Sequence, residues 1–128
     1  NLTKEVDSIG GPATAAIPII SSTIAISSIL FGRSLKGFYI WPSVKEHGLA
    51  NVIEGSVGEE SKVAIVDDTV TSGNSIISSI KEVEKVGCKV LQTISVFDRN
   101  EGGVEKLESE GYNNYSIFKY DHKENKLI

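Results

Sequence analysis

The sequence predicts an α/β fold in three layers, with a mostly parallel central sheet of about five to six strands flanked by helices. Two observations support this prediction. Short apolar segments typical of strands alternate along the chain with segments whose apolar residues recur at helical spacing. Strands alternating with helices favour a parallel sheet covered on both faces. The 128 residues, 40% of them hydrophobic, suffice for one such domain, so we expect a single domain over residues 1–128.

The first half of the chain is predicted to hold three short strands and one helix. Val6–Gly11 is expected to form a strand that ends in a glycine turn, and Gly37–Trp41, rich in aromatic residues, favours a second strand. Pro18–Leu30 lies in an apolar run that serines and threonines interrupt and that is too short to span a bilayer, so we predict a buried helix. The polar residues 42–51 predict a loop, and Val52–Val57 predicts a further short strand.

The second half alternates more regularly between the two patterns. From Ser75 to Val86 the apolar residues fall on one helical face, and Gly87 follows where a helix end favours glycine. Val104–Glu110 predicts a short amphipathic helix that Gly111 closes. The strands predicted around these helices are Lys62–Val66, Val90–Phe97 and Tyr115–Tyr120.

The composition argues against several partners and locations. The net charge is -4 and no block of basic residues is present, so no nucleic-acid partner is expected. No membrane-spanning segment and no signal peptide are predicted. The single cysteine, Cys88, cannot form an internal disulfide and has no Cys or His neighbours at metal-binding spacing. A reducing, cytoplasmic location is therefore expected.

Ligand-binding residues are expected at one edge of the sheet, because open parallel sheets bind ligands beyond the carboxyl ends of their strands. Four predicted strand ends lie there: Gly10-Gly11, Trp41, Asp67-Asp68 and Asp98-Arg99. Asp67 and Asp68 directly follow an apolar strand, and neighbouring residues of a strand point to opposite faces. We therefore expect the strand to end at this pair, so that both carboxylates reach one ligand.

The loop after these acids has the properties of a phosphate site. Thr71–Ser75 contains hydroxyls, one glycine and an asparagine, and it leads into a predicted helix whose N-terminus presents unpaired N–H groups. The Gly-Lys-Ser/Thr ending of a Walker loop is absent, so a single phosphate monoester is expected. Carboxylates accept hydrogen bonds from hydroxyls, and the combination describes a ribose 5-phosphate. A plain strand–turn–helix with a Ser N-cap is the alternative, and repulsion between the adjacent acids argues against it.

Four segments together carry a resemblance to a known family. They are GGPATAAIPI (residues 10–19), KEHGLANVIEG (45–55), VAIVDDTVTSG (63–73) and FDRNEGGVEKLESEGY (97–112). In this order they resemble the pyrophosphate loop, the flexible catalytic loop, the PRPP-binding signature and the Asp-Arg segment of the type I phosphoribosyltransferases. The resemblance is closest to the orotate phosphoribosyltransferases, and it extends over nearly the whole chain.

The resemblance implies an enzyme of pyrimidine biosynthesis that joins orotate to PRPP, forming orotidine 5′-monophosphate and pyrophosphate. Lys45, His47, Asp67 and Asp68 are the implied catalytic residues: the first two would stabilise the leaving pyrophosphate, and the acids would hold the ribose hydroxyls. Arg99 and Thr71 would bind orotate, since a guanidinium matches its carboxylate. The implied PRPP-binding residues are Ala13, Thr14, Ala15, Ala16, Lys45, His47, Asp67, Asp68, Thr69, Val70, Thr71, Ser72, Gly73, Asn74 and Ser75.

The resemblance also implies a cofactor and an oligomeric state. Mg²⁺ is the implied cofactor, brought by PRPP and water near Asp67 and Asp68 with no ligand set assigned, since Mg²⁺ commonly keeps water and substrate oxygens as ligands. A homodimer is implied because the catalytic loop of the family reaches across to the site of the partner subunit. The expected partners are thus two small molecules, PRPP and orotate, and a second copy of the chain.

Two features depart from the family pattern. Trp41 and Pro42 stand where the orotate enzymes have Arg-Lys, and each lost charge-assisted contact costs about 1.5–3 kcal/mol. Only Asn1–Glu5 precede the first strand, where the family has a helical segment that helps to cover the base. Arg99 can alternatively pair with Asp98 or Glu101 on the surface, and Lys45 and His47 can alternatively belong to a solvated loop.

Three alternative functions therefore stay open. The first is a phosphoribosyltransferase that acts on another base. The second is a regulatory module that binds PRPP without catalysis, which Trp41 and Pro42 motivate. The third is a nucleotide-binding α/β domain of unrelated ancestry.

Overall fold

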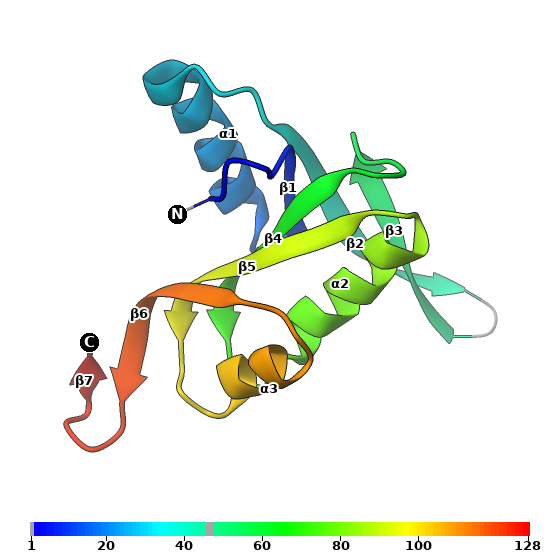
Figure 1. Cartoon of the computed structure of the whole chain (residues 1–128). Helices are drawn as coiled ribbons and strands as arrows, with labels where there is room; N and C mark the ends of the chain where they lie inside the picture. The colour runs from blue at the N-terminus through cyan, green and yellow to red at the C-terminus, as the bar shows by residue number, and fades with distance from the viewer. Residues whose placement is uncertain (1, 46–47) are drawn as a thin grey trace.

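A seven-stranded sheet organises the computed structural model, which describes residues 2–45 and 48–128 (Figure 1). The strands lie in the order β3-β2-β1-β4-β5-β6-β7, and neighbours from β2 to β6 are parallel. The edge strands β3 and β7 are antiparallel to β2 and β6. The strands are β1 (Ser8–Pro12), β2 (Lys36–Lys45), β3 (Gly48–Gly55), β4 (Lys62–Val70), β5 (Lys89–Asp98), β6 (Asn114–Asp121) and β7 (Lys126–Leu127). The helices are α1 (Ile17–Phe31), α2 (Asn74–Lys85) and α3 (Gly103–Ser109).

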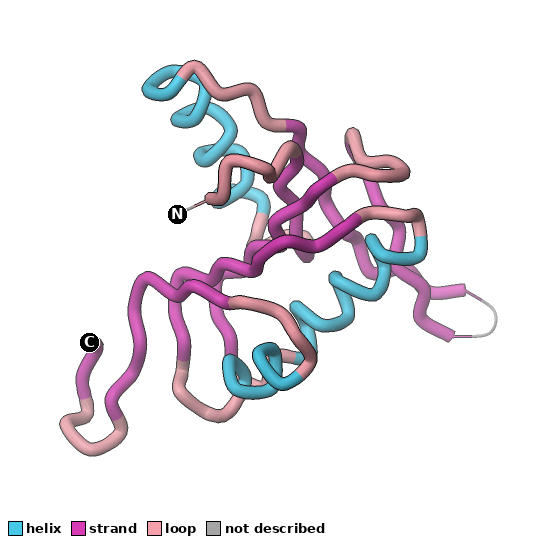
Figure 2. The backbone as a smooth tube through the Cα atoms, viewed as in Figure 1, coloured by secondary structure: helices cyan, strands magenta, loops and turns pink. Residues whose placement is uncertain are grey.

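Helices cover both faces of this sheet, so the predicted three-layer α/β fold is confirmed (Figure 2). Helix α1 packs against β1, β2 and β4 on one face, whereas α2 packs against β4 and β5 on the other and α3 lies beside β6. Two apolar cores result. Ile9, Ile20 and Ala64 belong to the core under α1, and Ile65 and Ile80 belong to the core under α2.

Strand β4 contributes to both cores because successive side chains of a strand point to opposite faces. Val63 and Ile65 belong to the core under α2, while Ala64 and Val66 belong to the core under α1. All four side chains are buried. The continuous apolar run in the sequence is therefore explained by a central strand that is covered on both sides.

The strand order reverses between β1 and β4, and we call the region beyond the carboxyl ends of these two strands the crevice, because open α/β sheets bind ligands at this position. Helix α1 leads from β1 to β2 on one side of β1, whereas β4 pairs with the other side of β1. The strand order thus reverses at this pair, and such a reversal separates the loops that follow the two strands. Ligands of open α/β sheets bind at such a reversal, so the fold places the loops after Pro12 and Val70 at the expected position.

Several predicted elements differ in extent from the observed ones. The loop predicted over residues 42–51 is wrong in the described part, because β2 continues to Lys45 and β3 begins at Gly48 as the two arms of an antiparallel pair. Strand β4 does not end at Val66 but continues to Val70. The short strand β7, which was not predicted, pairs with β6 at the sheet edge. Sheet pairing, which adds hydrogen bonds to polar segments, explains each extension.

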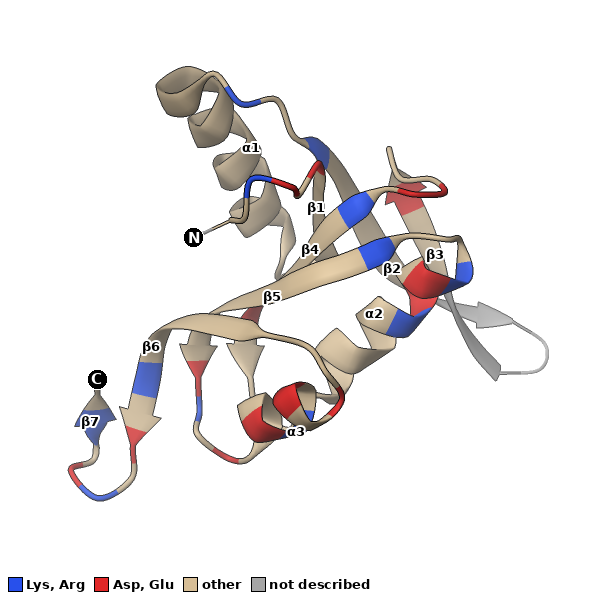
Figure 3. Cartoon of the chain, in the orientation of Figure 1, with Lys and Arg blue, Asp and Glu red and all other residues tan. Residues whose placement is uncertain are grey.

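The prediction that the helix after β1 is buried is also wrong. Ile20 and Ser27 are the buried residues of α1, whereas Ile29 and Phe31 are 79% and 75% exposed. The helix carries no charged residue along its length, as Figure 3 shows. Its apolar composition therefore indicates a surface that is only half covered by the sheet of this chain.

Candidate functional site

Asp67 and Asp68 lie on β4 near its carboxyl end, and their side chains point to opposite faces of the sheet. The alternation along β4 places Asp67 on the face of Val63 and Ile65, toward α2, and Asp68 on the opposite face. Asp67 is only 5% exposed, whereas Asp68 is exposed. The expectation that the strand ends at this pair is wrong, because β4 continues through Val70 and only Asp68 opens directly to solvent.

Two hydrogen bonds hold the Asp67 carboxylate. Its Oδ1 accepts from the backbone N–H of Asp68 at 2.8 Å, and its Oδ2 accepts from the hydroxyl of Ser75 at 3.2 Å. Burial raises the pKa of Asp67 to about 7, because desolvation disfavours the charged carboxylate. The neighbouring charge of Asp68 acts in the same direction, while the Ser75 hydroxyl opposes it. Asp67 is thus a carboxyl group that changes charge near neutral pH.

The loop from Thr71 to Ser75 connects β4 to the N-terminus of α2. Thr69 is half-buried and Val70 buried at the strand end, whereas Thr71 and Ser72 are exposed. Helix α2 begins at Asn74 with Gly73 as its N-cap, and among the described residues no side chain caps it. The Ser72 hydroxyl accepts a 3.3 Å hydrogen bond from the Asn74 N–H. The loop therefore presents hydroxyls and helix N–H groups together, which suits an anion.

Gly73 is required by the close approach of a second loop. Its φ of +84° lies in the left-handed region, and a Cβ there would lie 2.9 Å from the carbonyl oxygen of Gly103. A Cβ on Gly103 would in turn lie 2.6 Å from the carbonyl oxygen of Thr71. The first turn of α3 is thus packed against the loop before α2. The Gly102-Gly103 pair in the sequence is the signal for this contact.

The loop after β1 lies beside β4 across the crevice. Gly11 has no room for a side chain, because a Cβ there would collide with the carbonyl oxygen of Val66. Beyond it, the Ala13 N–H donates to Ile40 at 2.9 Å and the Ala16 N–H donates to Pro12 at 3.2 Å. Thr14 and Ala15, which lie between them, are exposed. Of the four residues predicted to bind pyrophosphate, these two remain the candidates for presenting N–H groups to a ligand.

Arg99 follows β5, the parallel neighbour of β4, and so lies at the same carboxyl end of the strands as the loop after Val70. It is exposed, and its Nε lies 3.8 Å from a carboxylate oxygen of Glu101. Its backbone N–H donates to the carbonyl of Val70 at 3.0 Å, so the loop after β5 is tied to the end of β4. Asp98 is buried and accepts a 2.8 Å hydrogen bond from the Asn100 N–H instead of pairing with the guanidinium.

The predicted catalytic loop lies partly outside the described residues. His47 falls there, and Lys45 is placed as the last residue of β2. Trp41 lies in the same strand, and its indole Nε1 is buried without a hydrogen-bond partner in the described part of the chain. The arms of β2 and β3 thus carry the ends of this loop away from the body of the sheet (Figure 1).

One residue that sequence reasoning missed lies beside Arg99. The imidazole Nε2 of His122, in the turn between β6 and β7, lies 3.0 Å from the carbonyl oxygen of Arg99 and 3.1 Å from that of Asn100. No local pattern in the sequence points to this histidine. Its place after β6 is the one indication, because β6 pairs in parallel with β5 and the residues that follow the two strands therefore lie at the same end of the sheet.

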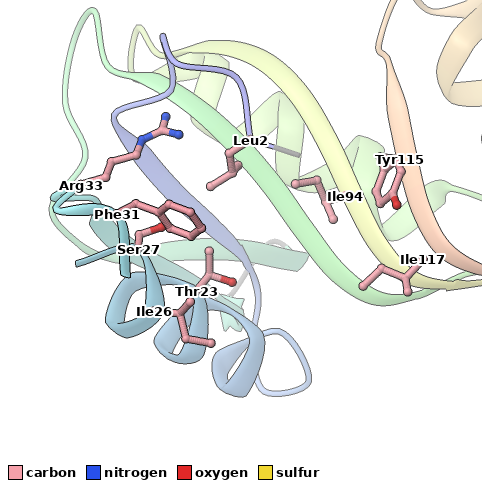
Figure 4. Close-up of a pocket in the computed structure, with 9 residues that line it drawn as sticks. All are labelled: Leu2, Thr23, Ile26, Ser27, Phe31, Arg33, Ile94, Tyr115 and Ile117. Atoms are coloured by element: carbon pink, nitrogen blue, oxygen red, sulfur yellow. The ribbon is translucent and has the colours of Figure 1, made fainter. Parts of the chain in front are cut away.

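An apolar hollow lies on the face of the sheet that α1 covers. It has a volume of about 730 Å³ and lies between α1 and the uncovered surfaces of β5 and β6 (Figure 4). Ile26 and Phe31 line it from α1, Ile94 from β5, and Tyr115 and Ile117 from β6. None of the predicted site residues lines it. The hollow therefore belongs to the exposed apolar surface around α1, and not to the crevice.

A model of the phosphoribosyl transferase domain matches residues 5–125, which include the crevice and every loop around it. The chain belongs to the phosphoribosyl transferase family. The predicted resemblance to type I phosphoribosyltransferases is thereby confirmed.

Relatives of this phosphoribosyltransferase carry more specific names. The chain is 36% identical over 113 residues to the orotate phosphoribosyltransferase of Aquifex aeolicus, covering 88% of this chain and 61% of the relative. It is 41% identical over 90 residues to that of Sulfolobus acidocaldarius, covering 70% and 45%. The solved structure of Mycobacterium tuberculosis orotate phosphoribosyltransferase in complex with PRPP superposes with a TM-score of 0.77 at 28% identity, covering 91% of this chain and 64% of that one. The chain thus spans well under the full length of these relatives.

Three further observations concern metal ligands, membrane-spanning helices and the single cysteine of this phosphoribosyltransferase. Over residues 2–45 and 48–128, no group of three or more His, Cys, Asp or Glu side chains is arranged to hold a metal ion. Within the same ranges, no helix is long and apolar enough to cross a bilayer. Cys88 is buried, and its thiol donates to the carbonyl of Gly58 at 3.3 Å.

Proposed function

We propose that the protein is an orotate phosphoribosyltransferase, which transfers the 5-phosphoribosyl group of PRPP to orotate and releases pyrophosphate. The observation that carries the proposal is the arrangement at one sheet edge of Asp67 and Asp68, the loop Thr71–Ser75, and Arg99 on the next strand. The relatives named as orotate phosphoribosyltransferases support the choice of base.

Three groups of residues are proposed to bind three parts of the substrates: the 5′-phosphate, the ribose hydroxyls and the orotate carboxylate. The hydroxyls and N–H groups between Thr71 and Ser75 bind the 5′-phosphate at the positive end of α2. The Asp68 carboxylate is exposed near the strand end and accepts hydrogen bonds from the ribose hydroxyls. Asp67, which is buried and accepts from Asp68 and Ser75, is the second proposed acceptor, and it holds this end of β4 in place. Arg99 holds the carboxylate of orotate through two parallel hydrogen bonds, for which it would leave the weak 3.8 Å contact with Glu101.

The chemical step exchanges one bond at the ribose C1. The bond from C1 to the pyrophosphate oxygen breaks and pyrophosphate leaves with the electron pair, while a ring nitrogen of orotate forms the new bond to C1 and gives up its proton. Catalysis then consists of positioning and of stabilising the leaving anion. We propose Lys45 and His47 for the second role, as cationic or donor groups on a loop that closes over the pyrophosphate.

Mg²⁺ is the proposed cofactor, and the donor set fits a metal that arrives with its substrate. Asp68 offers an exposed carboxylate, one oxygen of which accepts the Thr69 N–H at 2.8 Å, and the described residues contain no larger cluster of ligands. Because Mg²⁺ keeps water and substrate oxygens, one or two protein oxygens are sufficient. When bound, the ion supplies positive charge to the pyrophosphate.

An assay of base consumption tests the proposal. The protein is incubated with PRPP, Mg²⁺ and one of four bases, orotate, uracil, adenine or hypoxanthine, and loss of the base is followed by absorbance. Consumption of orotate alone, with stoichiometric pyrophosphate, is expected. Consumption of a purine in place of orotate would assign the protein to another substrate class of the same family.

A second candidate, a PRPP-binding module without catalysis, is favoured by Trp41 and Pro42. These residues stand where the family resemblance implies two cations, and the Trp41 side chain supplies only an indole N–H. Calorimetry distinguishes the two functions. Tight PRPP binding without pyrophosphate release for any of the four bases supports the module, and turnover of orotate removes it.

A homodimer and a cytoplasmic location complete the proposal. Helix α1 is uncharged and exposes Ile29, Leu30 and Phe31, so two copies can meet on this surface without burying unpaired charge (Figure 3). Light scattering after gel filtration tests it: a dimeric mass is expected for the wild type and a monomeric mass for Phe31→Asp. The free thiol of Cys88 supports a reducing compartment.

A further inference from the structure

The loop that carries Arg99 is held at three points of its backbone. Its N–H group at Arg99 donates to Val70, and its N–H group at Asn100 donates to the buried carboxylate of Asp98 at 2.8 Å. Asn100 adopts a left-handed conformation with φ of +58°. The third point is His122, whose Nε2 lies 3.0 Å and 3.1 Å from the two successive carbonyl oxygens of Arg99 and Asn100.

The contact requires a proton on Nε2 of His122, because carbonyl oxygens only accept hydrogen bonds. The ring therefore acts as a shared donor to both carbonyls. Without it, two carbonyls at the bend of the loop would depend on solvent, and the peptide planes on either side of Arg99 would lose their common anchor. The direction in which the Arg99 side chain leaves the backbone depends on these planes.

The segment that carries His122 is itself well held. The Tyr120 ring and the imidazole pack in a T-shaped arrangement, with ring centroids 4.9 Å apart and planes at 80°. Asp121 Oδ1 accepts the N–H groups of Lys123 and Glu124 at 2.9 Å and 3.2 Å, which fixes the turn. The Tyr120 hydroxyl also contacts Asn125 across the turn. The β6–β7 turn lies at the same sheet edge as the loop after β5 (Figure 1).

We infer that His122 is a positioning residue for base recognition: the β6–β7 turn uses it to fix the backbone of the Arg99 loop, and so the aim of the guanidinium at the base. This inference rests on the proposed function, because Arg99 is assigned to the base there. His122 holds the loop at the Arg99 and Asn100 carbonyls, whereas a separate hydrogen bond, from the Arg99 N–H to Val70, ties the loop to β4. The proposed ribose and phosphate sites on β4 and α2 do not contact His122 in these hydrogen bonds. Its loss should therefore affect the base and leave PRPP binding unchanged.

Three variants test the inference by steady-state kinetics. His122→Ala removes the donor, His122→Gln keeps an N–H group near the position of Nε2, and Lys123→Ala changes an exposed side chain of the same turn. We expect His122→Ala to raise KM for orotate roughly 3- to 10-fold with KM for PRPP unchanged. His122→Gln and Lys123→Ala should stay close to the wild type. Equal rises in both KM values, or no rise in either, would overturn the inference.

Limited proteolysis provides a readout that is independent of activity. Trypsin cleaves after Arg99 only when the loop opens, so cleavage there, followed by mass spectrometry, should be faster in His122→Ala than in the wild type, His122→Gln or Lys123→Ala. An unchanged cleavage rate in His122→Ala removes the anchoring role. If the wild-type protein uses another base, the proposed function fails while the proteolysis result stands, and the KM comparison is made with that base.

Discussion

The hydroxyl of Ser75 donates a 3.2 Å hydrogen bond to Oδ2 of Asp67, joining the first turn of α2 to the buried face of β4. The contact places the proposed phosphate loop and one ribose-binding acid in a single rigid unit. It also favours the ionised carboxylate at a position where burial disfavours it. The charge of Asp67 near neutral pH therefore depends on burial and the Asp68 charge, which raise its pKa, and on the hydrogen bonds from the Asp68 N–H and the Ser75 hydroxyl, which lower it.

Replacing Ser75 shifts that balance. Ser75→Ala removes a donor to the ionised form, so the pKa of Asp67 should rise further from its wild-type value of about 7. Ser75→Thr keeps a hydroxyl and should leave the pKa close to 7. Carbon-detected NMR titration of the carboxyl groups measures both. An Asp67 titration that is identical in the alanine variant would show that the hydrogen bond has no effect on the charge.

The raised pKa of Asp67 also predicts a pH dependence of stability. Folding raises this pKa from 3.8 to about 7, so between these values the folded state binds more protons than the unfolded state. The free energy of unfolding from this group is therefore largest below pH 3.8 and falls as the pH rises through about 7. Asp67→Asn lacks the titrating group, so its Tm should exceed that of the wild type by an amount that grows from acidic to alkaline pH.

Thermal melts of Asp67→Asn and the wild type between about pH 4 and pH 9 measure this difference. Glu108→Gln, which changes an exposed carboxylate on α3, is the matched control and should give a small and nearly constant difference. A Tm difference for Asp67→Asn that shrinks with rising pH would contradict the assignment of a raised pKa.

Gly73 is expected to be less replaceable than Gly111, a second glycine with positive φ. Gly73→Ala costs about 1–2 kcal/mol for the left-handed conformation, and its Cβ would lie 2.9 Å from Gly103 O, which adds about 1–3 kcal/mol of overpacking. Gly111→Ala has a similar φ of +90° but open space around it, so it carries only the first cost. Urea denaturation should rank the two variants in this order, and equal destabilisation would exclude the contact with Gly103.

Arg99 is expected to determine the base. Arg99→Ala should raise KM for orotate roughly 10- to 150-fold, because a charge-assisted contact of about 1.5–3 kcal/mol is lost. Glu101→Ala removes only the exposed partner 3.8 Å away and should change KM by less than about 5-fold. Steady-state kinetics with varied orotate compare the two. Orotate kinetics that are unchanged in Arg99→Ala would remove the assignment of orotate.

Elements whose signals are local were predictable. The bounds of the apolar strand before Asp67 and of the amphipathic α2 lie within a few residues of the predicted ones. The predicted glycines follow the ends of α2 and α3 with positive φ. Burial pattern and backbone conformation are encoded in neighbouring residues, so these features could be predicted. The ends of β2 and β3 were not predictable. Residues 42–45 and 48–51 form an antiparallel pair there, and such pairing depends on a partner strand more than on local composition.

By itself the sequence determined the α/β class. It also predicted that the strand, the two acids and the loop after them form one ligand site, and it named Asp67, Asp68 and Arg99 as candidate residues. Only the tertiary structure decided that Asp67 is buried while Asp68 is exposed, that α1 is half uncovered, and that His122 contacts the Arg99 loop from 23 residues away. The physical reason is that burial and long-range hydrogen bonds depend on the sheet register and on the packing of helices, which bring together residues that are distant in the chain.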